Sequence, residues 1–124
     1  MRVLLDTHLL LWSLASPERL SREARRLIDE SEVYVSAASI WEVSIKVALG
    51  KMQGDPREIV RAIEPAGLRH LPVTSVHAAA VTGLAPLHKD PFDRMLVAQA
   101  LCEPMLLLTN DAVLADYGPF VTVA

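Results

Sequence analysis

Short apolar runs separated by polar, turn-forming residues dominate the hydrophobic pattern of this chain. Four of these runs consist of strand-forming residues: Val3 to Leu5, Val33 to Val35, Met105 to Leu108 and Phe120 to Val123. A weaker run, Leu71 to Val73, contains Pro72, and proline restricts a strand to an edge or a strand end. Runs that are apolar on both faces are typical of a parallel sheet that is covered on two sides.

Between these runs, apolar residues recur with the period of an amphipathic helix. This spacing occurs in four segments: Leu20 to Ile28, Trp41 to Leu49, Ile59 to Ala66 and Val76 to Leu84. The segment from Pro91 to Cys102 is apolar over most of its circumference, which predicts a largely buried helix. Ser21 is a candidate N-cap, and Gly50 and Gly67 are candidate helix ends. Strands alternating with helices predict a three-layer α/β/α sandwich with a mostly parallel sheet of four to five strands.

Length and composition add limits to this picture. A chain of 124 residues fits a single domain over residues 1–124, and 52% hydrophobic residues are enough for a sizeable core. No apolar run reaches the roughly 18 residues of a membrane span, and Asp6 and His8 interrupt the N-terminal run, which argues against a signal peptide. The single cysteine, Cys102, excludes an internal disulfide framework and suits a reducing cytoplasm. Its apolar surroundings predict a buried thiol.

Carboxylates follow the predicted strands. Asp6 comes directly after the first strand, and Asp111 follows the strand that ends near Leu108. Glu42 lies in the second turn of the helix that begins near Ser36, and Asp93 lies at the start of the buried helix. Ligands of such sheets bind beyond the carboxyl ends of the strands, so we expect these acids to lie at one edge.

Acids that are clustered in this way repel one another, and a divalent cation removes the conflict. A site made only of oxygen ligands suits Mg²⁺ or Mn²⁺ rather than zinc. Such ions can activate a water and stabilise the leaving oxygen of a phosphodiester, so hydrolysis of this bond is the reaction that the acids favour. The net charge of −3 argues against a strong global positive field for nucleic acid, but it does not exclude contact with phosphates through metal ions.

Each acid also has a purely structural interpretation. Asp6 and Asp111 are candidate caps of the helices that follow them, and Glu42 stands four residues before Lys46, the spacing of a surface ion pair. Asp90 directly precedes Pro91, which favours capping, and Asp93 could complete a capping box with it. The joint placement of the acids is therefore more informative than any one of them.

Four stretches in this order and spacing resemble PIN domains, and most closely the VapC-type toxins of bacterial toxin–antitoxin pairs. The stretches are LLDTH, SIWEVSIKVALGKM, HKDPFDRMLVAQA and LLTNDAVLADYG, and together they span nearly the whole chain. The resemblance implies a Mg²⁺- or Mn²⁺-dependent endoribonuclease. It also implies a homodimer that is inhibited by a small cognate VapB-type antitoxin.

The family's four acids match Asp6, Glu42, Asp93 and Asp111 of this chain. Asn110 and Asp116 compete with Asp111 for the fourth position. The implied reaction is hydrolysis that leaves a 5′-phosphate and a 3′-hydroxyl, with no side chain as the nucleophile. An antitoxin could insert an arginine among the acids, while Trp41, Val47 and Leu49 line a groove for its helix.

Basic residues close to the acids in sequence are the candidates for phosphate contacts with RNA. Lys46 and Arg94 are the two that we select, although Arg94 could instead pair with a neighbouring acid. His8 and His88 lie near the acids in sequence, but we assign neither a catalytic role.

Three other functions compete with this one. A haloacid dehalogenase-type phosphatase needs a second Asp two residues after the first, where this chain has His8. Dinucleotide binding needs a G-x-G-x-x-G motif after a strand, and this chain has none. A non-catalytic RNA- or protein-binding module on a PIN-like fold remains the alternative to the nuclease.

Overall fold

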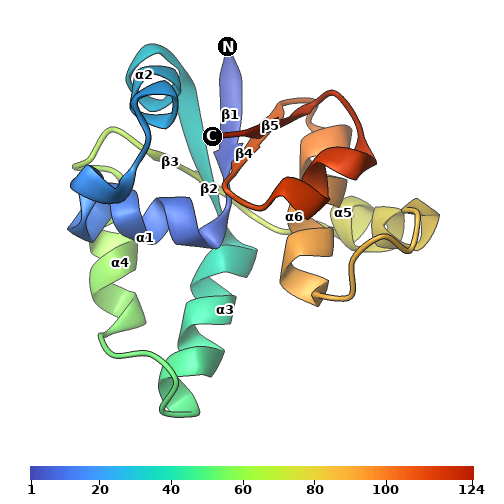
Figure 1. The fold of residues 1–124 in the computed structure, drawn as a ribbon. Coiled ribbons are helices and arrows are strands. Elements are labelled where there is room, and N and C mark those ends of the chain that lie inside the picture. The colour runs from blue at the N-terminus through green and yellow to red at the C-terminus, as the bar shows by residue number, and fades with distance from the viewer.

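A parallel sheet of five strands forms the centre of the molecule (Figure 1). The computed structural model describes all residues from Met1 to Ala124. The strands are β1 (Arg2–Leu5), β2 (Glu32–Ser36), β3 (Arg69–Leu71), β4 (Leu106–Thr109) and β5 (Val121–Val123). Their order is β3-β2-β1-β4-β5, and every neighbouring pair is parallel. The prediction of a mostly parallel sheet of four to five strands is confirmed.

Five of the six α-helices occupy the segments that the apolar pattern indicated, whereas the first one, directly after Asp6, was not among those segments. The six helices are α1 (Thr7–Ala15), α2 (Arg22–Glu30), α3 (Ala37–Ala48), α4 (Pro56–Ile63), α5 (Ser75–Ala80) and α6 (Pro91–Cys102). Three short 3₁₀ helices, η1 (Pro17–Arg19), η2 (Val81–Gly83) and η3 (Ala112–Tyr117), complete the chain. The hydroxyl of Ser21 accepts a hydrogen bond of 3.0 Å from Ala24 N, so the predicted cap of α2 is confirmed.

Alternating side chains of the strands face two separate cores. Val3 and Leu5 pack with residues of α1, α2 and α4 on one face of the sheet, whereas Leu4 packs with α6 on the other. Figure 1 shows α6 on the opposite side of the sheet from α1 and α2. This alternation is the reason that both faces of the central strand are apolar, and it confirms the predicted three-layer arrangement.

Three details differ from the predictions. The edge strand β3 ends at Leu71 because Pro72 has no N–H to donate, so the strand lies two residues earlier than the apolar run. Helix α5 is capped by Thr74 and ends at Ala80. The predicted burial of Cys102 is wrong, because this residue lies in the last turn of α6 and is exposed. None of the helices combines the length and apolar character that crossing a lipid bilayer requires.

A buried polar network fixes α6 against the start of α3. Gln99 is completely buried, and its Oε1 accepts a hydrogen bond of 2.6 Å from the hydroxyl of Ser36. Its Nε2 donates to the carbonyl of Pro72 at 3.2 Å and lies 3.3 Å from Nδ1 of His77. Nε2 of His77 lies 2.5 Å from a carboxylate oxygen of Glu103. Because buried amides need all their partners, this network sets the position of α6 relative to α3.

Candidate active site

Asp6 lies at the carboxyl end of β1, the central strand of the sheet. Leu5 pairs with Leu108 of β4, so the residues that follow these two strands are neighbours. The carboxylate of Asp6 is buried and accepts hydrogen bonds from Leu9 N at 2.9 Å and from the hydroxyl of Thr109 at 2.5 Å. Asp6 therefore caps α1 with one oxygen, as its structural interpretation predicted. Burial raises its pKa despite these hydrogen bonds.

Glu42 lies in α3 and is held by two partners. Its Oε1 is 2.7 Å from the hydroxyl of Thr7, which is also 3.0 Å from the hydroxyl of Ser39. Its Oε2 is 2.7 Å from Nζ of Lys46, so the predicted ion pair is present. Glu42 is 4% exposed, and the ion pair compensates a charge that burial would otherwise make costly. The hydrogen bond to Glu42 raises the pKa of Lys46.

Asp93 lies in the first turn of α6. The cap of this helix is Asp90, whose Oδ1 accepts hydrogen bonds from Phe92 N at 2.8 Å and Asp93 N at 3.0 Å. Burial, followed by the charge of Asp90, raises the pKa of Asp93 to about 6. The charges of Glu42 and Asp6 contribute to this rise of the pKa, whereas the charge of His88 opposes it.

Asp111 caps η3 and lies beside Asp6. Its Oδ1 accepts a hydrogen bond of 3.0 Å from Val113 N, so its predicted capping role is present. Its own N–H donates to the hydroxyl of Thr109 at 3.0 Å, and that hydroxyl donates to Asp6. Thr109 thus connects the two acids that follow β1 and β4.

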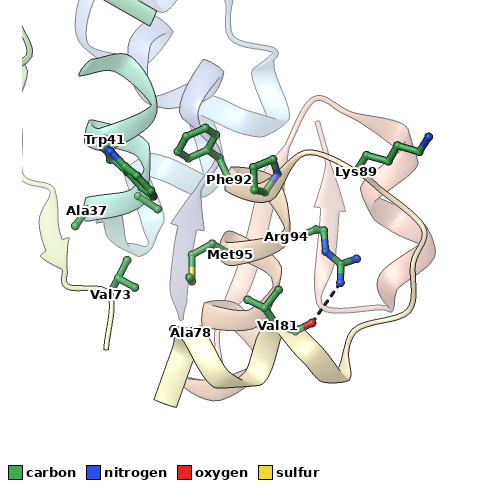
Figure 2. A pocket seen from close by; sticks show the side chains of 11 residues that line it. Ala37, Trp41, Val73, Ala78, Val81, Lys89, Phe92, Arg94 and Met95 are labelled. Carbon is green, nitrogen blue, oxygen red and sulfur yellow. Dashed lines mark hydrogen bonds between the residues drawn. The ribbon is translucent and has the colours of Figure 1, made fainter. Parts of the chain in front are cut away.

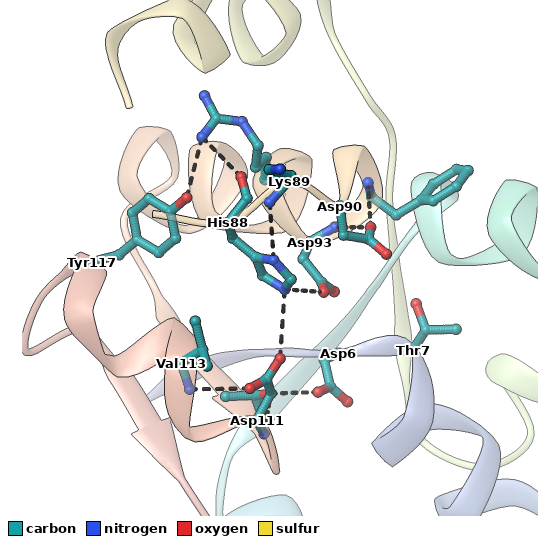
Figure 3. A network of polar contacts seen from close by, with 12 residues as sticks. Asp6, Thr7, His88, Lys89, Asp90, Asp93, Asp111, Val113 and Tyr117 are labelled. Atoms are coloured by element: carbon teal, nitrogen blue, oxygen red, sulfur yellow. Dashed lines mark hydrogen bonds and ion pairs between the residues drawn. The ribbon is translucent and has the colours of Figure 1, made fainter. Parts of the chain in front are cut away.

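His88 belongs to this group, although no catalytic role was predicted for it. Its Nε2 is 3.0 Å from Oδ2 of Asp93 and 3.5 Å from Oδ2 of Asp111 (Figure 3). Ligand atoms of His88, Asp93 and Asp111 all lie within 4.8 Å of one another. The signal in the sequence is its position in HKDPFD, where it precedes Asp93 by five residues. A histidine in a loop has no periodicity that would reveal which way its ring points.

The donor set fits a divalent cation. Asp93 and Asp111 meet around His88, and the charges of Glu42 and Asp6 act on Asp93, whereas the group of ligand atoms within 4.8 Å of one another does not include Asp6 or Glu42. Nε2 of His88 is buried there without a properly aligned hydrogen bond, even though two carboxylates are close to it. A cation among these groups would offset the repulsion and satisfy the unpaired nitrogen.

The two predicted phosphate-binding residues have different surroundings. Nζ of Lys46 is close to Glu42, and the charges of Asp90 and Asp93 also act on it. The guanidinium of Arg94 instead donates to the carbonyls of Val81, Ala85 and His88 and to the hydroxyl of Tyr117. These bonds connect α6 to the loop that carries His88. The donors of Arg94 are engaged within the protein, whereas Lys46 stands beside the acids.

An apolar groove of about 610 Å³ lies next to the acids, between α3, α5 and α6. Its lining includes Trp41, Val73, Ala78, Phe92 and Met95 (Figure 2). Trp41 is 63% exposed and packs edge-on against Phe92, with ring centroids 5.4 Å apart. Trp41 directly precedes Glu42, and Phe92 directly precedes Asp93. The groove and the acid site therefore share helices α3 and α6.

Comparison with known proteins finds similarity over nearly the whole chain. Residues 3–118 match the family model described as PIN domain. Ribonuclease VapC22 of Mycobacterium tuberculosis (strain ATCC 25618 / H37Rv) is 28% identical over 123 residues, which cover 93% of this chain and 91% of that protein. These matches confirm the resemblance that the four stretches indicated.

Two solved structures share the fold. VapBC2 from Rickettsia felis, bound to a DNA fragment from their promoter, contains a chain with a TM-score of 0.72 and 15% identity, covering 100% of this chain and 98% of that chain. A toxin–antitoxin complex from Klebsiella pneumoniae gives a TM-score of 0.67 and 17% identity, covering 98% of this chain and 96% of that chain. At these identities the likeness concerns the fold.

Proposed function

The chain belongs to the PIN domain family, and on this basis we propose that it is a Mg²⁺- or Mn²⁺-dependent endoribonuclease. The observation that carries the proposal is the group of carboxylates around the buried Nε2 of His88 at the carboxyl end of β1 and β4. The similarity to a ribonuclease supports RNA as the substrate. We further propose that it acts as the toxin of a VapBC-type pair in the cytoplasm.

Asp6, Glu42, Asp93 and Asp111 are the residues that would hold the metal. When bound, Mg²⁺ or Mn²⁺ supplies Lewis acidity toward a phosphodiester oxygen and lowers the pKa of a water so that it can act as the nucleophile. No protein side chain has to attack phosphorus. The expected products are a 5′-phosphate and a 3′-hydroxyl.

The remaining groups of the site orient these acids. The hydroxyls of Thr7 and Thr109 fix one oxygen each of Glu42 and Asp6, which limits the directions in which the carboxylates can point. Lys46 carries a positive charge beside the acids with 36% of its side chain exposed, so we propose that it contacts an RNA phosphate. The same role for Arg94 stays a prediction, and it would require bonds to Val81, Ala85 and His88 to be given up.

Cleavage of RNA by single-site variants tests the proposal. Asp6→Asn, Glu42→Gln and Asp93→Asn should each lose cleavage of a labelled RNA in Mg²⁺ or Mn²⁺ while keeping the circular dichroism spectrum of the parent. Asp29→Asn, on the exposed surface of α2, is the matched control and should cleave at the parental rate. EDTA should abolish cleavage by the parent. Two of the three site variants cleaving at the parental rate would exclude the metal site, and the chain would then fit the non-catalytic module.

The apolar groove supports the antitoxin as a partner. We propose that an apolar segment of the antitoxin packs on Trp41 and Phe92, while a basic side chain reaches the acids beside them. Of the residues predicted to line such a groove, Trp41 does so, whereas Val47 and Leu49 lie outside the lining. A Trp41→Ala variant should bind the cognate antitoxin at least about tenfold more weakly, since large exposed aromatics dominate such interfaces. Unchanged affinity would place the antitoxin elsewhere.

We also propose that the protein is a homodimer. Leu49 after α3 and Val60 of α4 are 63% and 41% exposed, and these two helices contact each other at one end of the molecule. Exposed apolar residues on adjacent helices are typical of an interface. Light scattering coupled to size exclusion should therefore give twice the mass of one chain.

A further inference from the structure

We propose that His88 is a nitrogen ligand of the metal site and shifts its preference from Mg²⁺ toward Mn²⁺. This inference rests on the proposed metal-dependent function, and it adds a fifth residue to the four acids. It concerns the choice between Mg²⁺ and Mn²⁺, because four carboxylates alone do not determine this choice.

The first support is the position of the imidazole. Nε2 of His88 is 3.0 Å from one oxygen of Asp93 and 3.5 Å from one oxygen of Asp111. Ligands at neighbouring corners of an octahedron with bonds of about 2.1 Å are about 3.0 Å apart. The separation from Asp93 equals this spacing, the separation from Asp111 is longer, and all three ligand atoms lie within 4.8 Å of one another. The two acids come from different elements, since Asp93 lies in α6 and Asp111 caps η3.

The second support is the lack of any other partner for this nitrogen. A histidine that only oriented a carboxylate would direct its Nε2–H along one hydrogen bond, as Nε2 of His77 does toward Glu103. Nε2 of His88 is buried and forms no aligned hydrogen bond with either nearby acid. Buried polar atoms without partners are rare, so the geometry points to a missing group between His88 and the two acids.

The third support is that the protein holds the His88 loop in place. Arg94 donates to the carbonyl of His88 at 3.4 Å and to that of Ala85 at 3.0 Å. Arg94 and Asp93 are neighbours in α6, so the same helix turn positions the carboxylate and the loop that faces it. The N–H of Lys89 donates a hydrogen bond of 3.1 Å to Nδ1 of His88, which places the proton of a neutral ring on Nε2. Coordination through Nε2 requires the proton on Nδ1, so this hydrogen bond must break when the ion binds.

The chemical consequence is selectivity. Mg²⁺ is a hard ion that prefers oxygen ligands, whereas imidazole nitrogen suits transition-metal ions. Replacing one oxygen corner by nitrogen therefore weakens Mg²⁺ relative to Mn²⁺. A site with the four acids alone would discriminate less between the two.

Pulsed electron paramagnetic resonance of the Mn²⁺-loaded protein tests this ligand directly. The parent should show nitrogen modulation from a coordinated imidazole, and His88→Gln should lose it. His8→Gln is the matched control, because His8 is exposed and lies two residues after Asp6, and this variant should keep the modulation. Labelling the histidines of the parent with ¹⁵N should change the modulation, so the test does not depend on how the variant folds.

Calorimetric titration gives the second measurement. The ratio of the Mg²⁺ to the Mn²⁺ dissociation constant should fall at least about fivefold in His88→Gln and stay unchanged in His8→Gln. Mn²⁺ that binds the parent without nitrogen modulation, or modulation lost in His8→Gln instead, would overturn the role of His88 and leave the four-acid site intact. A parent that binds no Mn²⁺ at all would overturn both this inference and the proposed metal-dependent function.

Discussion

The hydroxyl of Thr7 lies 2.7 Å from Oε1 of Glu42, so the residue after the first acid orients the second acid. A hydroxyl has one proton, and a carboxylate can only accept, so Thr7 donates to Glu42 and accepts from Ser39. Thr7→Val removes the donor at nearly constant shape. We expect RNA cleavage to fall about 10- to 100-fold, the usual effect of losing an outer-shell partner. Thr7→Ser should restore most of it, and equal rates for the two variants would contradict the role of the hydroxyl.

Metal binding should stabilise the fold, because it offsets the repulsion among the acids. At a metal concentration of about 100 times the dissociation constant, the free energy of unfolding should rise by about 2.7 kcal/mol. The measurement is the melting temperature with Mn²⁺ or EDTA. Asp6→Asn should reduce this rise and Asp29→Asn should retain it. A melting temperature of the parent that changes with neither Mg²⁺ nor Mn²⁺ would exclude a functional metal site.

The raised pKa of Asp93 predicts how the stability of the metal-free protein depends on pH. Because the pKa is about 6 in the folded protein and near its ordinary value of 3.8 when unfolded, the folded state binds more protons between these values. The contribution of Asp93 is therefore favourable at low pH and is lost as pH rises from about 4 to about 6. Asp93→Asn should be more stable than the parent in EDTA at pH 7, by on the order of 2 kcal/mol, and less so at pH 4.

Urea unfolding of the two proteins at both pH values measures this difference. A stability gap between parent and variant that is the same at pH 4 and pH 7 would show that Asp93 does not titrate in this range. Protonation of Asp93 also competes with metal binding. The affinity of the parent for Mn²⁺ should therefore decrease as the pH falls below about 6.

Lys46 should act on RNA through charge. Lys46→Ala should lower kcat/KM and should also reduce the slope of its logarithm against the logarithm of salt concentration by about 0.7, the value for one phosphate contact on a single strand. Lys46→Arg keeps the charge and should restore the slope. Because Lys46 also pairs with buried Glu42, the alanine variant should melt at a lower temperature. An unchanged salt slope would mean that Lys46 contacts no RNA phosphate and only pairs with Glu42.

Variants of Asp90 test whether this acid only caps α6 or also belongs to the metal site. Asp90→Ala removes both hydrogen bonds to the first turn of α6 and should cost about 1 kcal/mol of unfolding free energy. Asp90→Asn retains an acceptor oxygen and should keep most of that stability. Both variants should still cleave RNA, and both should lower the pKa of Asp93, since the charge of Asp90 raises it. Loss of cleavage in Asp90→Asn would place this residue among the metal ligands.

Much of the fold follows from local patterns. The apolar run Val3 to Leu5 and the periodic segment Pro91 to Cys102 specify a buried strand and a buried helix, because burial on both faces removes the alternation of polar residues. The position of Asp6 at a strand end was predictable for the same reason. The exposure of Cys102 was not, since the end of a helix leaves the core at a point that only packing decides.

The finer geometry of the site depends on contacts between distant segments. His88 and Asp111 meet because the loop before α6 and the start of η3 come together in the fold, and no local pattern relates residues 23 positions apart. Arg94 similarly satisfies carbonyls of the loop before it instead of pairing with an acid. Every residue has a backbone carbonyl, so the sequence does not show which loop carbonyls need a hydrogen-bond donor from a side chain.

The pairing of β1 with β4 has a consequence for synthesis of the protein. Strand β1 is the first to leave the ribosome, and it lacks its neighbour β4 until Leu106–Thr109 has been made. Asp111 is added only after that. A prematurely terminated chain that lacks this strand cannot close the sheet around Asp6. Asp6 and Asp111 are thus brought to the same edge of the sheet only late in translation.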